Sequence, residues 1–103
     1  TMRVIKPATV REWMREHPRA KPGLEWWLDV VGTARWKTFV EMKRTIPAAD
    51  QVKVASGRQV IVFNIGGNAF RLVAAVHFNR GLVYALAFLS HAEYSKDRWK
   101  ETL

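Results

Sequence analysis

The sequence predicts an α+β domain in which N-terminal helices pack on a small antiparallel β-sheet. Two observations lead to this fold class. Apolar residues recur at spacings of three and four through residues 7–46, as they do on one face of a helix. From residue 52 onward they alternate or form short runs bounded by glycine-containing turns, as they do in strands. Helices followed by strands indicate an α+β arrangement. We expect one domain over residues 2–103, because a chain of 103 residues supports a single thin core.

The first half of the chain contains a possible edge strand at 3–5 and two predicted helices. Pro7 suits the first position of a helix, where its missing N–H costs nothing, and Pro22 opens the second helix in the same way. Pro18 ends the first helix and Gly32 is a plausible end for the second. The two apolar stripes consist of Val10, Trp13, Met14 and His17, and of Leu24, Trp27, Leu28 and Val31.

A third, shorter helix is predicted between Thr38 and Pro47. Thr38 and Glu41 have the spacing of a capping box, in which each side chain bonds the other residue's backbone N–H. Its inward face consists of Phe39, Met42 and Ile46. Trp26 and Trp36 lie off the apolar stripes, so we expect them at a partner interface, where tryptophan is favoured.

The second half predicts an antiparallel meander. The expected strands are a short alternating segment around Val52 and Val54, then residues 59–65, 70–78 and 82–89, with turns at Gly66-Gly67-Asn68 and Asn79-Arg80-Gly81. The strand at 82–89 is almost continuously apolar, which predicts burial on both faces. A short helix or tail is expected from Ser90 to Trp99.

The charge balance favours an anionic ligand or partner. The formal net charge is +8 and the isoelectric point is about 10.5, values that suit a nucleic acid, an acidic surface or an acidic protein. Residues 32–80 carry eight cations and two anions, whereas residues 1–31 are nearly balanced. The ligand is therefore expected to meet the middle of the chain.

Several classes of function are excluded or disfavoured. The chain has no cysteine, which excludes disulfides, thiolate nucleophiles and cysteine zinc sites. No apolar run approaches the roughly 20 residues of a spanning helix, and no signal-peptide core is visible. We therefore expect a cytoplasmic protein without a membrane partner. The three histidines lack the spacing of a zinc motif, so we expect neither a metal nor another cofactor.

Two short motifs have competing interpretations. Gly66-Gly67 resembles part of a phosphate-binding loop, but no Lys-Ser/Thr pair or helix follows, which favours a hairpin turn. His91, Glu93 and Tyr94 lie within four residues and offer groups for acid–base catalysis. Ser90 and Glu93 also have capping-box spacing, so the same segment is expected to begin a helix; the two interpretations are compatible.

Arg71 is the most informative cation, because it interrupts an otherwise apolar strand. One interpretation is structural: a solvated arginine on an edge strand, or a member of an ion pair. The other is functional: a guanidinium that projects from a rigid sheet and binds a phosphate with its two-pronged donor geometry. Position in the sequence does not separate the two.

These segments resemble the HigB toxins of bacterial toxin–antitoxin systems, which belong to the RelE-like superfamily. The hairpin Val62-Phe-Asn-Ile-Gly-Gly-Asn-Ala-Phe-Arg-Leu-Val73 is similar to the family pattern "VFNIGGNxxRLV". Ser90-His-Ala-Glu-Tyr94 is similar to "THxEYD". Weaker similarities are Arg3-Val-Ile-x-Pro7, Trp36-Lys-Thr38 and Met42-Lys43, so the resemblance covers residues 3–95.

The resemblance implies a RelE-like toxin fold and a metal-independent mRNA endoribonuclease that cuts mRNA in the ribosomal A site and inhibits translation. It also implies a helix-turn-helix antitoxin of the HigA type as the partner in a hetero-oligomer. In such enzymes the 2′-hydroxyl of one nucleotide attacks its own phosphate, while a base, an acid and an arginine assist.

The resemblance also implies residue roles. Arg71 would stabilise the phosphate, His91 and Tyr94 would act in proton transfer or positioning, and Glu93 is a weaker catalytic candidate. Contacts with the RNA backbone and ribosomal RNA are assigned to Lys43, Arg44, Lys53, Arg58 and Asn64.

The sequence departs from the family pattern at several positions. Ser90 and Ser95 replace the Thr and Asp of "THxEYD", and Val62 and Asn64 stand where many RelE relatives carry lysines. Leu86 stands where many members carry a strand arginine, which predicts a weakened or differently organised site. Two alternatives to a nuclease therefore stay open: a module that binds RNA, the ribosome or the antitoxin without cleavage, and a toxin remnant that serves in operator repression with its antitoxin.

Overall fold

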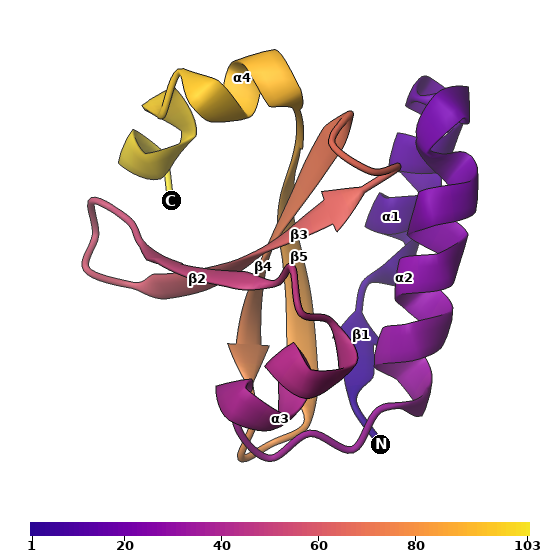
Figure 1. The fold of residues 1–103 in the computed structure, drawn as a ribbon, viewed down its shortest axis with the longest axis vertical. Helices are drawn as coiled ribbons and strands as arrows, with labels where there is room; N and C mark the ends of the chain where they lie inside the picture. The colour runs from indigo at the N-terminus through magenta and orange to yellow at the C-terminus, as the bar shows by residue number, and fades with distance from the viewer.

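The structure, a computed structural model that describes residues 1–103, is a twisted five-stranded sheet with two long helices on one face (Figure 1). The helices are α1 (Pro7–Glu16), α2 (Lys21–Thr33), α3 (Phe39–Thr45) and α4 (His91–Ser95), and the strands are β1 (Arg3–Ile5), β2 (Asp50–Lys53), β3 (Gln59–Ile65), β4 (Phe70–His77) and β5 (Leu82–Ser90). Short 3₁₀ turns cover Pro18–Ala20 and Arg98–Glu101. The predicted α+β class is confirmed.

The sheet is mixed rather than purely antiparallel. Its strand order is β1-β5-β4-β3-β2, and β2 to β5 form the predicted antiparallel meander. The edge strand β1 instead runs parallel to β5, with Val4 opposite Val83. The whole helical layer separates these two strands in the sequence, and a long crossover of this kind is what parallel pairing requires. The expectation of an antiparallel sheet therefore needs this correction.

The larger core lies between the sheet and the helices α1 and α2. Leu24, Trp27 and Val31 of α2 are completely buried, and the Trp27 ring meets the edge of the Phe63 ring with centroids 5.6 Å apart. The stripe predicted for α2 therefore forms the core, as the helical spacing indicates. Of the two off-stripe tryptophans, Trp26 is 47% exposed.

The interface expected at Trp36 is wrong. Its side chain is buried, and its indole Nε1 donates a hydrogen bond of 3.1 Å to the Thr45 hydroxyl at the end of α3. Only one of the two hydrogen bonds of the predicted capping box forms at the start of α3. The Thr38 hydroxyl accepts from the Glu41 N–H, whereas the Glu41 carboxylate accepts from the Lys37 N–H and not from that of Thr38. The loop before α3 is thus held by specific polar contacts.

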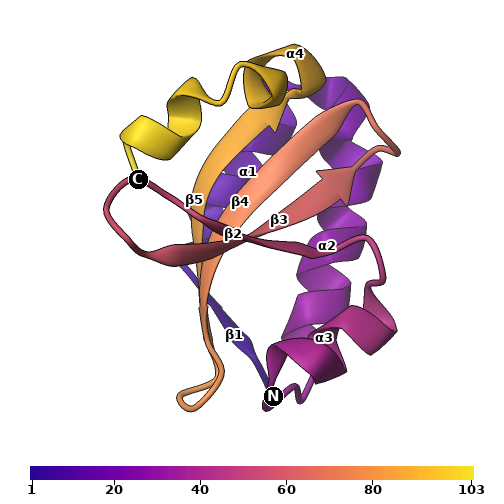
Figure 2. The ribbon, with the colours of Figure 1, turned by 60° about the vertical axis from the view of Figure 1, so that its left-hand side comes forward.

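A smaller core lies on the second face of the sheet, under the C-terminal segment (residues 91–103). Trp99 of this segment packs against Val60, Val62 and Val73. The segment leaves the end of β5 and crosses to the loop between β2 and β3, where the Ala55 N–H bonds the Lys100 carbonyl over 2.9 Å. Figure 2 shows it arching over one end of this face.

The predicted burial of β5 on both faces is wrong, because only Val83 in this strand is fully buried. Two features of the sheet leave most other side chains of β5 half-exposed. The strand β1 pairs with only the first three residues of β5, Leu82 to Tyr84. The C-terminal segment also covers only part of the second face of the sheet.

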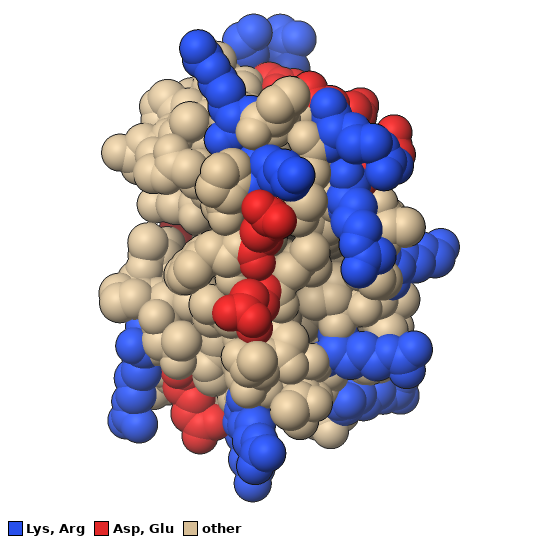
Figure 3. Space-filling model, turned by 90° about the vertical axis from the view of Figure 1, so that its right-hand side faces the viewer, with Lys and Arg blue, Asp and Glu red and all other residues tan.

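The charged side chains are unevenly placed. On the face that carries α1 and α2, acidic side chains form a central line with lysines and arginines around it (Figure 3). This mixed pattern does not favour the helical face as the place for an anionic ligand. None of the helices combines the length and the hydropathy of a membrane-spanning segment.

Candidate active site

The candidate site lies where the β3–β4 hairpin meets the junction of β5 and α4. The hairpin turns through Gly66 and Gly67, which have φ values of 63° and 69° and so occupy the left-handed region that glycine tolerates. The Ala69 carbonyl in this hairpin accepts a 3.0 Å hydrogen bond from the His91 N–H. The predicted turn therefore does more than reverse the chain, because it fixes the start of α4 beside β4.

Arg71 is the only charged or polar residue that is buried, with 8% of its surface exposed. Its Nη1 donates to the carbonyl oxygens of Asn68 and Phe70, both over 3.1 Å. No carboxylate contacts it, since the molecule's two salt bridges join other residues. Its strand β4 lies inside the sheet between β3 and β5. Both structural interpretations of Arg71, the edge-strand arginine and the ion pair, are therefore wrong.

His91 is the exposed neighbour of this guanidinium. The Arg71 Nη2 lies 3.4 Å from the His91 Nδ1. Because a guanidinium can only donate, the ring nitrogen must be the acceptor, which places the proton of the neutral imidazole on Nε2. The arginine thus sets the tautomer and leaves the Nε2 side available to a ligand.

Tyr94 covers the same guanidinium from the α4 side. The Arg71 Cζ lies 5.4 Å from the centre of the Tyr94 ring, within the range of a cation–π contact. The other face of the ring stacks on Trp99 with centroids 5.4 Å apart, and the Trp99 indole donates to the Tyr94 carbonyl over 3.1 Å. Tyr94 is therefore held by the C-terminal segment as a half-buried lid on the arginine.

Glu93 faces its own helix end. Its carboxylate accepts the Ser90 N–H over 3.0 Å, and the Ser90 hydroxyl accepts the Glu93 N–H over 3.2 Å, which completes the predicted capping box. The hydrogen bond from the Ser90 backbone is the largest cause that lowers the pKa of the Glu93 carboxyl below its ordinary value of 4.5. At neutral pH this group is a carboxylate that accepts hydrogen bonds and has no proton to give.

The residues assigned to RNA contacts are dispersed. Asn64 lies directly opposite Arg71 in the β3–β4 pairing and so joins the site. The Lys43 ammonium donates to the carbonyls of Pro47 and Ala49, over 3.1 and 2.9 Å, and so holds the chain after α3. Arg44 is exposed on α3, which lies at the end of the molecule opposite α4 (Figure 1).

The remaining two cations flank the loop between β2 and β3. Lys53 ends β2, where strand alternation turns it away from the face on which Val52 packs. Arg58 precedes β3 and lines a separate pocket. The structure therefore brings together Arg71, His91, Tyr94 and Asn64, and leaves the four other cations apart.

Two cations that sequence reasoning missed lie next to the site. Lys96 and Arg98 line a groove of about 410 Å³ together with Glu93 and Leu89. Their only signal in the sequence is that they follow the His-x-Glu-Tyr segment directly. His17 lies on the helical face of the sheet, where its ring contacts those of Phe70 and Phe88 with centroids 5.5 and 5.4 Å apart, as its place on the apolar stripe of α1 indicates.

The arrangement suits an anion rather than a metal. No three His, Asp or Glu side chains come together as a set of metal ligands. A buried charge is normally paired, because removal from water is costly without a partner. Arg71 is buried with carbonyl oxygens, a histidine and a tyrosine ring around it, and no carboxylate contacts its guanidinium. A guanidinium in such surroundings can bind an anion such as a phosphate group.

The comparison with known proteins places this geometry in a family context. The family model described as HigB_toxin, RelE-like toxic component of a toxin–antitoxin system, matches residues 20–97. The mRNA interferase HigB of Escherichia coli O6:H1 is 27% identical over 95 residues, which cover 92% of this chain and 90% of the relative. The mRNA interferase toxin HigB of Escherichia coli K12 and the mRNA interferase HigB of Shigella flexneri are each 27% identical over 93 residues, which cover 90% of this chain and 88% of the relative.

Proposed function

The chain belongs to the HigB family, the RelE-like toxic component of toxin–antitoxin systems, and on this premise we propose that it is an mRNA endoribonuclease that acts on ribosome-bound mRNA. The observation that carries the proposal is the buried, unpaired Arg71 in contact with His91 and Tyr94. The names of the relatives, mRNA interferases, support the same activity. Residues 2–103 form one toxin domain in this proposal.

The chemistry needs no cofactor. The 2′-oxygen attacks the adjacent phosphorus, the bond from phosphorus to the 5′-oxygen breaks, and a 2′,3′-cyclic phosphate and a 5′-hydroxyl result. One proton leaves the 2′-hydroxyl and one reaches the 5′-oxygen. We assign the exchange of these protons to His91 and Tyr94. Arg71 stabilises the charge that builds on the phosphate oxygens.

Arg71 is prearranged for this task. Its bonds to the Asn68 and Phe70 carbonyls fix the guanidinium before substrate arrives, so little reorganisation is needed during the reaction. Asn64, on the neighbouring strand, offers an amide that orients the RNA beside the guanidinium. Glu93 acts as a positioning residue, because it caps α4 and so holds His91 and Tyr94.

The partners follow from the family. A toxic component implies an antitoxin that masks it, and we propose a helix-turn-helix antitoxin of the HigA type in a hetero-oligomer with this chain. The proposed substrates, mRNA and the ribosome, place the protein in the cytoplasm. The exposed Trp26 on α2 offers the antitoxin an aromatic contact that the core does not use.

A bacterial translation extract tests the activity. The purified toxin is added and the mRNA ends are mapped by primer extension, with Arg71→Ala and His91→Ala proteins in parallel. Arg11→Ala on the exposed side of α1 removes an equal charge and is the matched control. We expect new mRNA ends with the wild type and the control, and loss of these ends with the two site variants.

A parallel reaction with mRNA in the absence of ribosomes tests whether cleavage depends on the ribosome. Cleavage only when ribosomes are present supports the full proposal, whereas equal cleavage of naked mRNA contradicts the ribosomal part. Arrested translation with intact mRNA would instead favour the module that binds without cleavage. That second candidate rests on Leu86, which stands where the resemblance to the family pattern implies a second strand arginine, so Arg71 has no such partner in the sheet.

A further inference from the structure

A second pocket lies on the same face of the sheet as Arg71. It has a volume of about 410 Å³ and is lined by Arg58, Gln59, Ala75, His77, Tyr84 and Leu86. Strand alternation places Arg71, Val73, Ala75 and His77 on one face of β4. Ala75 lies four positions after Arg71, which is about 13 Å along a strand. We call this the Tyr84 pocket.

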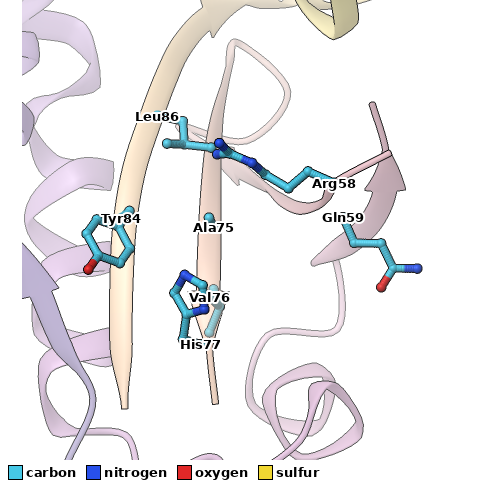
Figure 4. A pocket seen from close by; sticks show the side chains of 7 residues that line it. All are labelled: Arg58, Gln59, Ala75, Val76, His77, Tyr84 and Leu86. Atoms are coloured by element: carbon cyan, nitrogen blue, oxygen red, sulfur yellow. The ribbon is translucent and has the colours of Figure 1, made fainter. Parts of the chain in front are cut away.

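The Tyr84 pocket has aromatic side chains on one side and the short side chain of Ala75 at its base. Ala75 lies directly opposite Tyr84 in the β4–β5 pairing, and its short side chain leaves the space open. The His77 and Tyr84 rings meet edge to face with centroids 5.5 Å apart. Tyr84 is one of the three large hydrophobic residues that stay exposed. Figure 4 shows Arg58 extending across β4 toward Leu86, with Tyr84 and His77 below it.

A β-bulge supplies the apolar side of the pocket. The pairing of β4 with β5 shifts between Val73 and Ala74, so that Leu86 has no partner opposite it. Bulges turn a side chain out of the regular alternation. Leu86 therefore lines the Tyr84 pocket. A leucine favours the ring of a base over a phosphate.

The polar groups around the pocket have no partners within the protein. The Arg58 guanidinium, the His77 imidazole and the Tyr84 hydroxyl take no part in any hydrogen bond or salt bridge, whereas the nearby Gln59 amide is engaged by Gln51. No acidic side chain lines the pocket. The pocket therefore offers an aromatic surface, unpartnered hydrogen-bonding groups and a cation without a nearby acidic side chain. A nucleotide matches these with its flat ring, its hydrogen-bonding edges and its negative phosphate.

We propose that the Tyr84 pocket binds a base of single-stranded RNA that lies outside the scissile dinucleotide, with Arg58 on its phosphate. This inference rests on the proposed function, because the RNA is the strand held at Arg71. Trp99 covers Val73 between the two sites, so the strand passes along β5 instead. Leu89 of β5 lines the groove with Lys96 and Arg98, and Leu86 lines the Tyr84 pocket. The pocket thereby gives the toxin a base preference away from the cut.

Binding of short 2′-O-methyl oligoribonucleotides, which cannot be cut, tests this inference by fluorescence anisotropy. Tyr84→Leu and His77→Leu keep apolar bulk and remove the aromatic surface. Each is expected to weaken binding by about five-fold or more and to reduce the differences between base sequences. Val40→Ala is the matched control, because it trims an exposed apolar side chain on α3, away from the pocket, and it should bind like the wild type.

Photo-crosslinking places the base independently of affinity. An oligonucleotide with 4-thiouridine at successive positions is expected to crosslink to peptides that contain residues 75–86 from one position only. Wild-type affinity in both pocket variants, or crosslinks confined to other peptides, would overturn the inference. So would a loss of antitoxin binding with unchanged affinity for RNA, which would make the pocket a protein-docking site.

The nuclease activity and the Tyr84 pocket can be contradicted separately. If the wild type cuts mRNA in the extract and the pocket variants neither bind nor cut differently, the pocket inference is wrong and the nuclease stands. If the wild type binds oligonucleotides through Tyr84 but leaves mRNA intact, the nuclease is wrong and the pocket stands.

Discussion

Arg71 derives its role from the fork of its guanidinium rather than from charge alone. The terminal nitrogen Nη1 donates to two backbone carbonyls, while the second terminal nitrogen, Nη2, faces His91. A lysine keeps the charge but has neither the planar fork nor the stacking surface that meets Tyr94.

We therefore predict that Arg71→Lys folds but loses most of its cleavage. Removal of one preorganised donor to a transition state costs about 100-fold to 1,000-fold in rate, and Arg71→Lys should fall in this range. Cleavage rates in the translation extract measure the loss, and the thermal unfolding midpoint checks the fold. A rate within a few-fold of wild type would show that charge alone is sufficient.

Glu93 differs from the other candidates because its role is structural. Its lowered pKa means that the folded state binds the proton more weakly than the unfolded state. The carboxylate therefore contributes stability that is complete above its ordinary pKa of 4.5 and is lost as the pH falls through the lower folded value.

We predict that Glu93→Gln removes this part of the pH dependence and leaves cleavage nearly intact. The amide oxygen still accepts the Ser90 N–H, so α4 remains capped. Urea unfolding of both proteins from neutral pH to below 4.5 gives the first comparison, and the extract assay gives the second. A large loss of cleavage in Glu93→Gln would return Glu93 to the catalytic residues.

At the scale of elements, the site depends on how closely α2 approaches the hairpin that carries Arg71. A Cβ at Gly23 would lie 2.8 Å from the Ile65 side chain and 2.9 Å from the Gly66 backbone nitrogen. Gly32, near the other end of the same helix, has nothing within 4 Å of such a Cβ. The two glycines offer a matched pair in one element.

We predict opposite effects for alanine at these two positions. Gly32→Ala should raise the free energy of unfolding by up to about 1 kcal/mol, because alanine is the better helix former. Gly23→Ala gains the same propensity but forces α2 away from the hairpin, as overpacking does at a cost of about 1–3 kcal/mol. Chemical denaturation measures both changes. A stabilised Gly23→Ala protein would show that the hairpin yields without cost.

The elements also show what a sequence can and cannot predict. The hairpin at Gly66 and the cap at Ser90 are local, because each depends on residues within a few positions of one another. The parallel pairing of β1 and the exposure of β5 depend on segments far apart in the chain, so no local pattern indicates them. For this reason local patterns predict the strands and the meander of β2 to β5, but not the parallel neighbour of β1.

The same distinction holds in the candidate site. His91 and Tyr94 form a short motif, and the resemblance joins them to Arg71 without a structure. The burial of Arg71 depends on Trp99, which comes from the far end of the chain and holds Tyr94 over it. The Tyr84 pocket was missed because its residues come from three separate segments and carry no recognised motif.

At the scale of the whole molecule, net charge and binding charge are different quantities. The +8 charge is dispersed over several faces, including the helical face, where cations surround acidic side chains (Figure 3). Lys43 is engaged by carbonyls, and Lys53 points away from the second face of the sheet. Only cations along the path from Arg71 to Arg58 are expected to displace counterions from RNA.

We therefore predict a shallow salt dependence for a protein this basic. Each neutralised phosphate of a single strand contributes about −0.7 to the slope of log affinity against log salt concentration. Two to four contacts, from Arg71, Lys96, Arg98 and Arg58, give a slope of about −1.4 to −2.8, whereas all eight net charges would give about −5.6. Arg58→Ala should reduce the slope by about 0.7, and Arg11→Ala should leave it unchanged. Anisotropy titrations of one oligoribonucleotide over a range of salt concentrations measure these slopes. A slope near −5.6, lowered equally by both variants, would mean that RNA binds the whole basic surface and that no path across the sheet is preferred.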